Sequence, residues 1–175
     1  MARQLWLLRH AEAEPHGARA DADRTLTARG ERQAKTAGVA LARLGVRFDA
    51  ILSSPKSRAR QTAEIAAAEW GSHERERLRI HAPLAGEFDA TQARDAASEI
   101  APDGRLLLVG HEPDLSRLIA DLTGGQVDLK KGGLAAVRLE GLGGELALLG
   151  LGGELALLLR PRDLALIAGV PADGH

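Results

Sequence analysis

The chain contains no cysteine in its 175 residues. Disulfide bonds, thiolate metal sites and a cysteine nucleophile are therefore excluded. No apolar stretch reaches the roughly 18 residues that a membrane span needs, and the N-terminal apolar run 5–8 is far shorter than the core of a signal peptide. We expect a cytoplasmic protein without a membrane partner.

An excess of charge of one sign is also lacking, because 23 Lys and Arg stand against 24 Asp and Glu, for a net charge of -1. Such a balance gives no general attraction for nucleic acid or for an anionic membrane. Any affinity for an anion must come from a local cluster of basic residues. The length fits one domain, 1–175, which can bury a core without covalent staples.

Short apolar runs alternate with stretches that have helical spacing, which is typical of the α/β class. Strands are expected at 5–8, 49–53, 78–81, 105–109 and 134–139. The run 5–8 is apolar at every position, as in a parallel sheet whose two faces are both covered. The pattern predicts a three-layer α/β/α sandwich with a mainly parallel central sheet.

Caps and periodicity predict the helices between these strands. Thr27 can cap a helix that ends at Gly45, and its expected apolar stripe is Ala34, Ala37, Leu41 and Leu44. A second helix should begin at the cap Ser54 and continue to about Trp70, followed by a charged connection at 71–77. A third is expected at 91–100 from a threonine cap. The last of these helices should bury Leu115, Leu118, Ile119 and Leu122.

The segment 141–149, GLGGELALL, is repeated letter for letter at 150–158. Nine residues are too few for a solenoid repeat, whose periods begin at about 20, so this is a local tandem duplication. We expect strands at 145–149 and 154–159, with one copy forming an extra edge strand or an extruded loop. The duplication holds no nucleophile and receives no catalytic role.

Polar residues follow three of the predicted strands at the point where each strand ends. Arg9-His10 follows the first, Ser54 with Arg58 a turn later follows the second, and His111 follows the strand at 105–109. Ligands of open α/β sheets bind at the carboxyl ends of the strands, which lie side by side in a parallel sheet. Two arginines, two histidines and helix N-termini at that edge would suit a doubly charged tetrahedral anion. The sequence therefore predicts a phosphate site.

These motifs resemble the histidine phosphatase superfamily, with its phosphoglycerate mutase-like fold, and within it the small SixA-type phosphohistidine phosphatases. The likeness covers about residues 5–125 and the closing segment 160–164. It is carried by Leu7-Leu8-Arg9-His10-Ala11, by Leu26-Thr27 with Gly30 and Gln33-Ala34, by Ser53-Ser54-Pro55 with Arg58-Ala59 and Gln61-Thr62, and by Val109-Gly110-His111.

The resemblance implies a role for each matching residue. His10 would be the nucleophile, forming a phosphohistidine intermediate that water hydrolyses. Arg9 and Arg58 would hold the phosphoryl oxygens, and His111 would hydrogen-bond the transferring group. No cofactor and no metal are implied, and the partner would be a phosphorylated protein carrying phosphohistidine or a small phosphate ester. The chemistry suits an imidazole, whose ordinary pKa near 6.5 leaves it largely neutral at pH 7.

The chain departs from the family pattern in the loop after His10 and at the general acid, and the second departure bears on the substrate. Ala11 replaces the usual glycine after the histidine. The acid that protonates an alkoxide leaving group has only two candidates, Glu87 and Asp89, and neither stands in a convincing motif. Phosphohistidine loses imidazole, a better leaving group, and tolerates a poor acid. The short segment before residue 105 leaves little to form a lid, so a protein-borne phosphohistidine is favoured over a small metabolite.

Three alternatives remain open from the sequence. Asp21-Ala22-Asp23-Arg24-Thr25 matches an aspartate-nucleophile motif, although a loop rather than a strand precedes it. A metal hydrolase could use His10 and His111 with Glu12 or Glu112, although nearby arginines would repel a cation. A non-catalytic phosphoprotein-binding module would keep the arginines but would not need His10.

Overall fold

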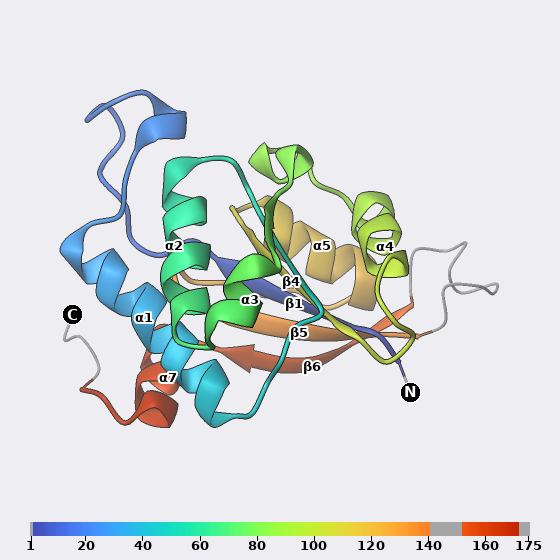
Figure 1. The fold of residues 1–175 in the computed structure, drawn as a ribbon. Coiled ribbons are helices and arrows are strands. Elements are labelled where there is room, and N and C mark those ends of the chain that lie inside the picture. The colour runs from blue at the N-terminus through green and yellow to red at the C-terminus, as the bar shows by residue number, and fades with distance from the viewer. Residues whose placement is uncertain (1, 141–151, 172–175) are drawn as a thin grey trace.

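One six-stranded sheet organises residues 2–140 and 152–171, the residues that the computed structural model describes (Figure 1). Its strands are β1 (Gln4–Arg9), β2 (Ala50–Ser53), β3 (Leu78–Ile80), β4 (Arg105–Gly110), β5 (Leu134–Leu139) and β6 (Gly153–Leu159). The order is β3-β2-β4-β1-β5-β6, in which β3, β2, β4 and β1 pair in parallel. Strand β5 is antiparallel to β1, and β6 is antiparallel to β5. The expected mainly parallel sheet is confirmed.

Helices cover both faces of this sheet (Figure 1). They are α1 (Ala28–Arg43), α2 (Ser57–Ala68), α3 (Ser72–Glu76), α4 (Ala90–Ser98), α5 (Asp114–Thr123) and α7 (Pro161–Ala168), with short 3₁₀ helices η1 (Asp21–Asp23) and η2 (Ala82–Ala85). Buried side chains of α1, α2 and α7 form one core against the sheet. Those of α4 and α5 form the other core.

Strand β1 shows why its sequence is apolar throughout. Successive side chains of a strand point to opposite faces. Trp6 and Leu8 accordingly enter the core beneath α1 and α2, whereas Leu5 and Leu7 enter the core beneath α4 and α5. Arg9 is the last residue of the strand, so the apolar run ends where the two cores end.

The predicted caps of two helices are wrong. Helix α2 begins at Ser57 rather than after a cap at Ser54. The Ser54 hydroxyl instead forms a hydrogen bond with the His111 ring and accepts one from the Lys56 amide. Helix α4 begins at Ala90 and is capped by Asp89 rather than by Thr91. Asp89 and Gln92 form a reciprocal capping box there, which satisfies two backbone N–H groups at once.

Two further sequence predictions are wrong, one for the segment 71–77 and one for Leu44. The charged connection at 71–77 contains a helix, α3, in which Glu74 is buried and pairs with Arg47 at 2.8 Å. Leu44, placed in the apolar stripe of α1, follows the last helical turn and is 47% exposed. The rest of the stripe is buried as predicted, and Thr27 is the N-cap.

The C-terminal strands close one edge of the sheet. Strand β6 pairs with β5 from Gly153 to Leu159, with one register shift between Ala136 and Val137 of β5, which confirms the strand expected at 154–159. The first copy of the duplication, with its predicted strand at 145–149, lies outside the described residues. Within the described part of the chain, no helix is both long and apolar enough to cross a membrane.

Candidate active site

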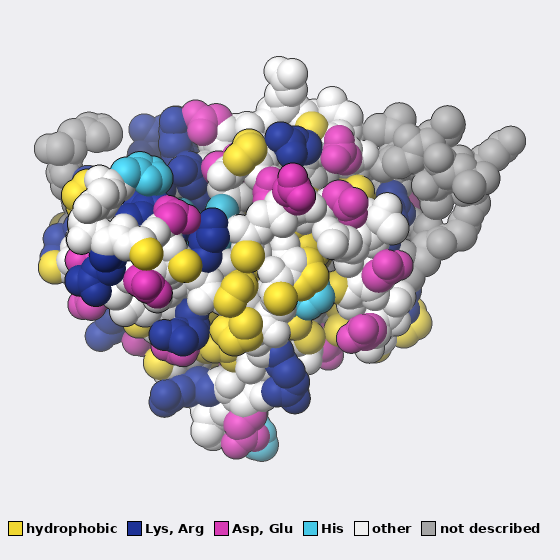
Figure 2. Space-filling view, turned by 90° about the horizontal axis from the view of Figure 1, so that it is seen from above, with side chains coloured by type: hydrophobic (Ala, Val, Ile, Leu, Met, Phe, Trp, Pro, Cys, Tyr) yellow, Lys and Arg dark blue, Asp and Glu magenta, His cyan; other side chains and the backbone are white. Residues whose placement is uncertain are grey.

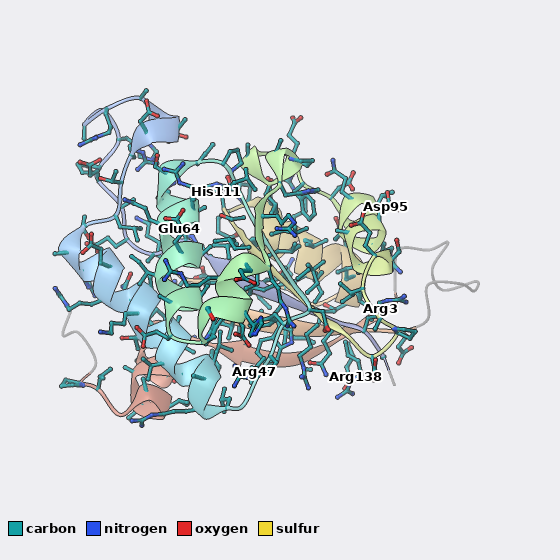
Figure 3. The ribbon with its side chains drawn as sticks, viewed as in Figure 1. Arg3, Arg47, Glu64, Asp95, His111 and Arg138 are labelled. Atoms are coloured by element: carbon teal, nitrogen blue, oxygen red, sulfur yellow. The ribbon has the colours of Figure 1, made fainter. Side chains whose placement is uncertain are left out.

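The predicted site residues lie at neighbouring strand ends. Strand β1 pairs with β4 so that Arg9 lies opposite Gly110, and the His10 amide donates to the Gly110 carbonyl at 3.0 Å. The Ser54 amide donates to Val109 at 3.0 Å, which ties the end of β2 to the same place. Figure 3 shows His111 at this end of the molecule, far from Arg3 and Arg138. The structure thus brings three strand ends together.

The His10 ring is held in one tautomer. Its Nδ1 lies 2.7 Å from the carbonyl oxygen of Ala11. A carbonyl can only accept, so Nδ1 must carry the hydrogen and Nε2 must keep its lone pair. The Nε–H of Arg58 donates to that Nε2 at 3.3 Å. His10 therefore presents an unprotonated nitrogen beside a guanidinium.

Burial keeps the His10 ring neutral. The side chain is only 6% exposed, and burial is the main cause that lowers its pKa to about 3. The hydrogen bond to Ala11 acts in the opposite direction, and the nearby His111, Arg58 and Arg9 lower the pKa further. At pH 7 the ring is thus in the form that can attack an electrophile.

His111 lies beside His10, with ring centroids 5.1 Å apart. Its Nε2 is 2.7 Å from the Ser54 hydroxyl, which already accepts a hydrogen bond from the Lys56 amide. The hydroxyl hydrogen of Ser54 has no other acceptor among the described residues, and when it is donated to Nε2 the ring hydrogen lies on Nδ1. That Nδ1 is buried and has no hydrogen-bond partner among the described residues. Burial, followed by the charges of Arg58 and Lys56, lowers the pKa of His111 to about 3.

The two predicted arginines are anchored in different ways. Arg9 donates to the Leu129 carbonyl at 2.9 Å, while its buried Nε has no partner in the described part of the chain. Arg58 is 4% exposed and donates to the backbone oxygen of Asp21 at 2.7 Å. Burial lowers the pKa of both guanidinium groups, and nearby carboxylates oppose that shift. Each arginine keeps donors near His10 for an anion.

Asp21 was missed as a partner of the site. Its carboxylate lies 2.8 Å from Arg24, 3.1 Å from Lys56 and 3.4 Å from Arg58. Hydrogen bonds from Arg24 and Lys56 hold the pKa of this carboxyl well below its usual range. No local sequence pattern indicates the contact between Asp21 and Arg58, which are 37 positions apart. Asp21 lies in η1 after a loop, rather than at the strand end that an aspartate nucleophile would need.

Lys and Arg side chains gather on one part of this face, with Asp and Glu among them (Figure 2). Figure 2 looks down on the end of the molecule where His111 lies in Figure 3. Opposite charges are thus mixed around the site, in keeping with the balanced charge of the whole chain.

The two candidate acids take no part in the contacts that join His10, Arg58 and His111. Asp89 is exposed and accepts the Gln92 amide at 2.9 Å as the cap of α4. Glu87 is exposed in the preceding loop, with φ at 61°. Neither carboxylate is therefore joined to His10, Arg58 or His111 by a contact in this structure.

Glu112 is a partly buried carboxylate near the site. Its Oε1 is buried without a hydrogen-bond partner among the described residues. Burial raises the pKa of this carboxyl, whereas bonds from Ser116 and the charge of Arg9 lower it. The sequence signal was its position directly after His111, where we weighed it as a metal ligand. Among the described residues, no group of three or more His, Asp or Glu is placed to hold a metal ion.

The loop after His10 is fixed by residues that the family-like motifs contain. The Thr62 hydroxyl accepts the Ala11 amide at 3.1 Å and donates to the Arg58 carbonyl at 2.7 Å. It therefore joins the loop directly to the helix that carries Arg58. The Glu12 carbonyl approaches α1 so closely that a Cβ on Gly30 would lie 1.9 Å from it. Only glycine fits at this position of the Gly30 motif.

Comparison with known proteins shows which family has this arrangement of residues. Residues 5–89 match the model of the histidine phosphatase superfamily, branch 1. An uncharacterized protein of Picosynechococcus sp. is 41% identical over 143 residues, which cover 77% of this chain and 84% of that protein. The chain belongs to the histidine phosphatase superfamily. The family supports a phosphatase activity for the site around His10.

Solved structures of phosphatases share the fold. The protein histidine phosphatase SixA complexed with tungstate matches with a TM-score of 0.76 and 22% identity, over 92% of this chain and 99% of that one. The alpha-ribazole phosphatase from Shigella flexneri matches with a TM-score of 0.62 and 23% identity, over 90% and 96%. The phosphoglycerate mutase-like fold is confirmed, and its relatives act on different phosphates.

Proposed function

We propose that the protein is a phosphatase that uses His10 as its nucleophile and hydrolyses phosphohistidine carried by a protein. The observation that carries the proposal is the fixed tautomer of His10. Its Nδ1 is committed to the Ala11 carbonyl, so the lone pair of Nε2 is free of a proton and faces Arg58. A site that only bound phosphate would need the arginines but not this nitrogen.

The reaction proceeds in two displacements. The Nε2 lone pair of His10, released from its hydrogen bond with Arg58, forms a bond to phosphorus while the bond from phosphorus to the leaving nitrogen breaks. The leaving ring keeps the electron pair and takes up a proton from solvent, so that it departs as neutral imidazole. Water then attacks phosphorus and passes a proton to solvent, inorganic phosphate is released, and His10 recovers its lone pair. A substrate P–O bond would break in the same way but would leave an alkoxide.

Arg9, Arg58 and His111 hold the phosphoryl oxygens in this proposal. The buried Nε of Arg9 and the buried Nδ1 of His111 have no partners among the described residues, so they can each donate one hydrogen bond. A hydrogen bond to a charged group contributes about 1.5–3 kcal/mol. Its contribution is larger when the charge develops during the reaction in a site from which water is excluded.

The leaving group separates the substrate classes. A departing imidazole can leave without strong acid help, whereas an alkoxide needs a proton at the moment of cleavage. Asp89 caps α4 and Glu87 is exposed, so neither is prepared as an acid. The lack of a positioned acid at Glu87 and Asp89 favours phosphohistidine over phosphate esters as the substrate.

A small phosphate ester is the second candidate substrate. It is favoured by the fold shared with the alpha-ribazole phosphatase and by Glu112, whose raised pKa suits a proton donor. Glu112 follows His111 directly and lies within electrostatic range of Arg9. An ester substrate would therefore depend on Glu112 much more strongly than phosphohistidine would.

A substrate panel tests the proposal. Phosphohistidine protein, phosphoserine peptide and a sugar phosphate are compared by kcat/KM, with wild type, His10→Ala and Glu112→Gln, in the presence of a chelator. We expect phosphohistidine to be preferred by at least about a hundredfold, with loss of activity only in His10→Ala. Preference for an ester together with loss in Glu112→Gln supports the second candidate. Tight binding of phosphoprotein without turnover contradicts both.

A further inference from the structure

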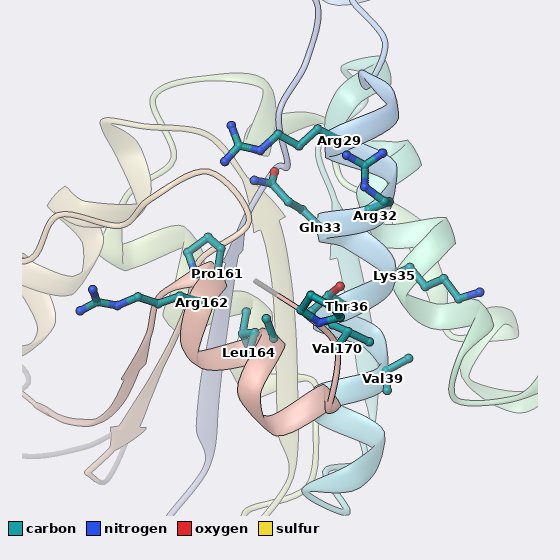
Figure 4. A pocket seen from close by; sticks show the side chains of 12 residues that line it. Arg29, Arg32, Gln33, Lys35, Thr36, Val39, Pro161, Arg162, Leu164 and Val170 are labelled. Carbon is teal, nitrogen blue, oxygen red and sulfur yellow. The ribbon is translucent and has the colours of Figure 1, made fainter. Parts of the chain in front are cut away.

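A groove of about 420 Å³ lies between α1 and α7, outside the set of residues around His10 (Figure 4). It begins beside the loop that follows His10. Gln33, which lines the groove, accepts the Glu12 amide through its side-chain oxygen at 3.0 Å. Arg29, at the same end, pairs with the Glu12 carboxylate at 3.3 Å. The groove is therefore continuous with the loop that positions His10.

The rim of this α1–α7 groove is basic. Arg29, Arg32 and Lys35 line it from α1, and Arg162 lines it from α7. None of the described residues that line it is acidic. Glu12, 3.3 Å from Arg29, and Asp163, 3.8 Å from Arg162, offset part of this charge, but four basic side chains against two carboxylates leave the rim positive. A partner with negative charge is favoured by long-range attraction and by contact.

The inner wall of the groove is apolar. Leu164 of α7 and Val39 of α1 line it, together with Pro161 (Figure 4). Leu164 is only 1% exposed and belongs to the core beneath α1, so the accessible apolar surface comes from Val39, Pro161 and Val170. Apolar lining favours the binding of a ligand that buries an aliphatic or aromatic side chain against it. Charge and lining together select an amphipathic acidic ligand rather than a bare anion.

The dimensions suit a segment of polypeptide. Arg29 and Val39 are ten residues apart on α1, a distance of about 15 Å along the helix. An extended chain covers that length with about five residues. A segment that leaves the phosphoryl group at His10 could thus enter the groove past Glu12 and place its acidic side chains against Arg32 and Arg162.

We infer that the α1–α7 groove binds an acidic, amphipathic segment adjoining the phosphohistidine of the protein substrate. The inference rests on the proposed function, because it assigns the substrate-docking surface of the same enzyme. Such a surface would also let the enzyme distinguish one phosphoprotein from another, because the roles proposed for Arg9, Arg58 and His111 concern the phosphoryl group alone. Such recognition should weaken as salt screens the exposed charges.

The test compares three substrates on the whole protein. Two are synthetic peptides of about eight residues with one phosphohistidine, flanked either by a block of Glu, Asp and Leu or by a block of Lys and Leu. The third is free phosphohistidine. We expect kcat/KM for the acidic peptide to exceed that for the basic peptide by about tenfold at low salt, chiefly through KM.

The groove variant is Arg32→Glu/Arg162→Glu, and its matched control is Arg75→Glu/Arg79→Glu. All four arginines are exposed, the charge change is the same, and Arg75 and Arg79 do not line the groove. We expect the acidic preference to disappear in the groove variant and to persist in the control. Hydrolysis of free phosphohistidine should stay unchanged in both. Anisotropy of a labelled, unphosphorylated acidic peptide gives the same comparison without catalysis.

Each outcome decides between the inference and the function beneath it. An acidic preference that survives in the groove variant overturns the inference and leaves the proposed function standing. Hydrolysis of none of the three substrates overturns the proposed function, while peptide binding that depends on Arg32 and Arg162 still supports the groove. A wild-type dimer that the groove variant dissociates in sedimentation would assign the groove to a second copy and overturn the inference.

Discussion

The Nε–H of Arg58 donates to Nε2 of His10 across 3.3 Å. The hydrogen bond joins the proposed nucleophile to one of the groups proposed to hold the phosphoryl oxygens. It also links two parts of the chain 48 positions apart, the end of β1 and the first turn of α2. Arg58 thus both aims the ring and supplies positive charge beside it.

Replacing Arg58 tests this double role. Arg58→Ala should lower kcat/KM by about a hundredfold or more, because the loss of a donor to developing charge is rarely compensated. Steady-state kinetics with phosphohistidine protein measure the effect. Arg60→Ala is the control, since Arg60 is exposed on the same helix and pairs only weakly with Glu64 at 3.7 Å. Activity within threefold of wild type in Arg58→Ala would contradict the assigned role.

Asp21 would compete with a bound phosphate for Arg58 and Lys56, because its carboxylate lies 3.4 Å from Arg58 and 3.1 Å from Lys56. Asp21→Asn removes that competing charge and can keep the backbone contact to Arg58. We expect KM for phosphohistidine protein to fall several-fold and inhibition by tungstate or inorganic phosphate to strengthen, with kcat changed less than twofold. Asp23→Asn, in the same short helix, should change neither. A higher KM in Asp21→Asn would show that Asp21 supports binding instead.

Ser54 is expected to position His111 rather than to react. Ser54→Ala removes the hydroxyl that lies 2.7 Å from Nε2, so this ring nitrogen loses the partner that would hold the ring hydrogen on Nδ1. We predict a fall in kcat of about tenfold with little change in KM, and a changed His111 tautomer in ¹⁵N NMR. Ser53→Ala is the matched control, because the Ser53 hydroxyl donates to the Ser54 carbonyl and not to the ring. An unchanged ¹⁵N pattern in Ser54→Ala would refute the positioning role.

Both histidines should remain neutral over the physiological range, because burial lowers their pKa values to about 3. Unfolded chains bind these protons near pH 6.5, so between pH 6.5 and about 3 the unfolded state binds more protons than the folded one. Their contribution to stability is complete above pH 6.5 and is lost as the pH falls toward 3. Urea unfolding should therefore give a lower free energy at pH 4.5 than at pH 7.

A titration of the ring resonances checks the cause. In ¹⁵N NMR the His10 ring, assigned by its absence from His10→Gln, should not titrate between pH 7 and 5. The pH dependence of unfolding should be shallower in His10→Gln than in wild type, because one lowered pKa is removed. A His10 midpoint near 6.5 in the folded protein would contradict the account.

The strand ends could be predicted from sequence because local rules determine them. An apolar run such as 5–8 identifies a buried strand, and the polar residue that follows it must lie beyond the carboxyl end of that strand. Arg9, His10, Ser54 and His111 were found in this way. The pairing of parallel strands then brings them together, whatever the loops do.

The contacts that depend on tertiary structure could not be predicted. The Ser54 side chain has the chemistry of a helix cap, but His111 engages it, and α2 begins three residues later. Asp89 has the chemistry of an acid, but Gln92 three residues on makes it a cap. Asp21 and the groove between α1 and α7 depend on loops and helices that approach each other across long stretches of sequence.

Trapping the intermediate tests the central claim most directly. The enzyme is mixed with isotopically labelled phosphohistidine protein, quenched in alkali within one turnover, and its peptides are mapped by mass spectrometry. We predict one phosphoryl group on His10, stable in base, lost in acid and absent from His10→Ala. Label on Asp21, or full turnover by His10→Ala, would contradict the claim that His10 is the nucleophile.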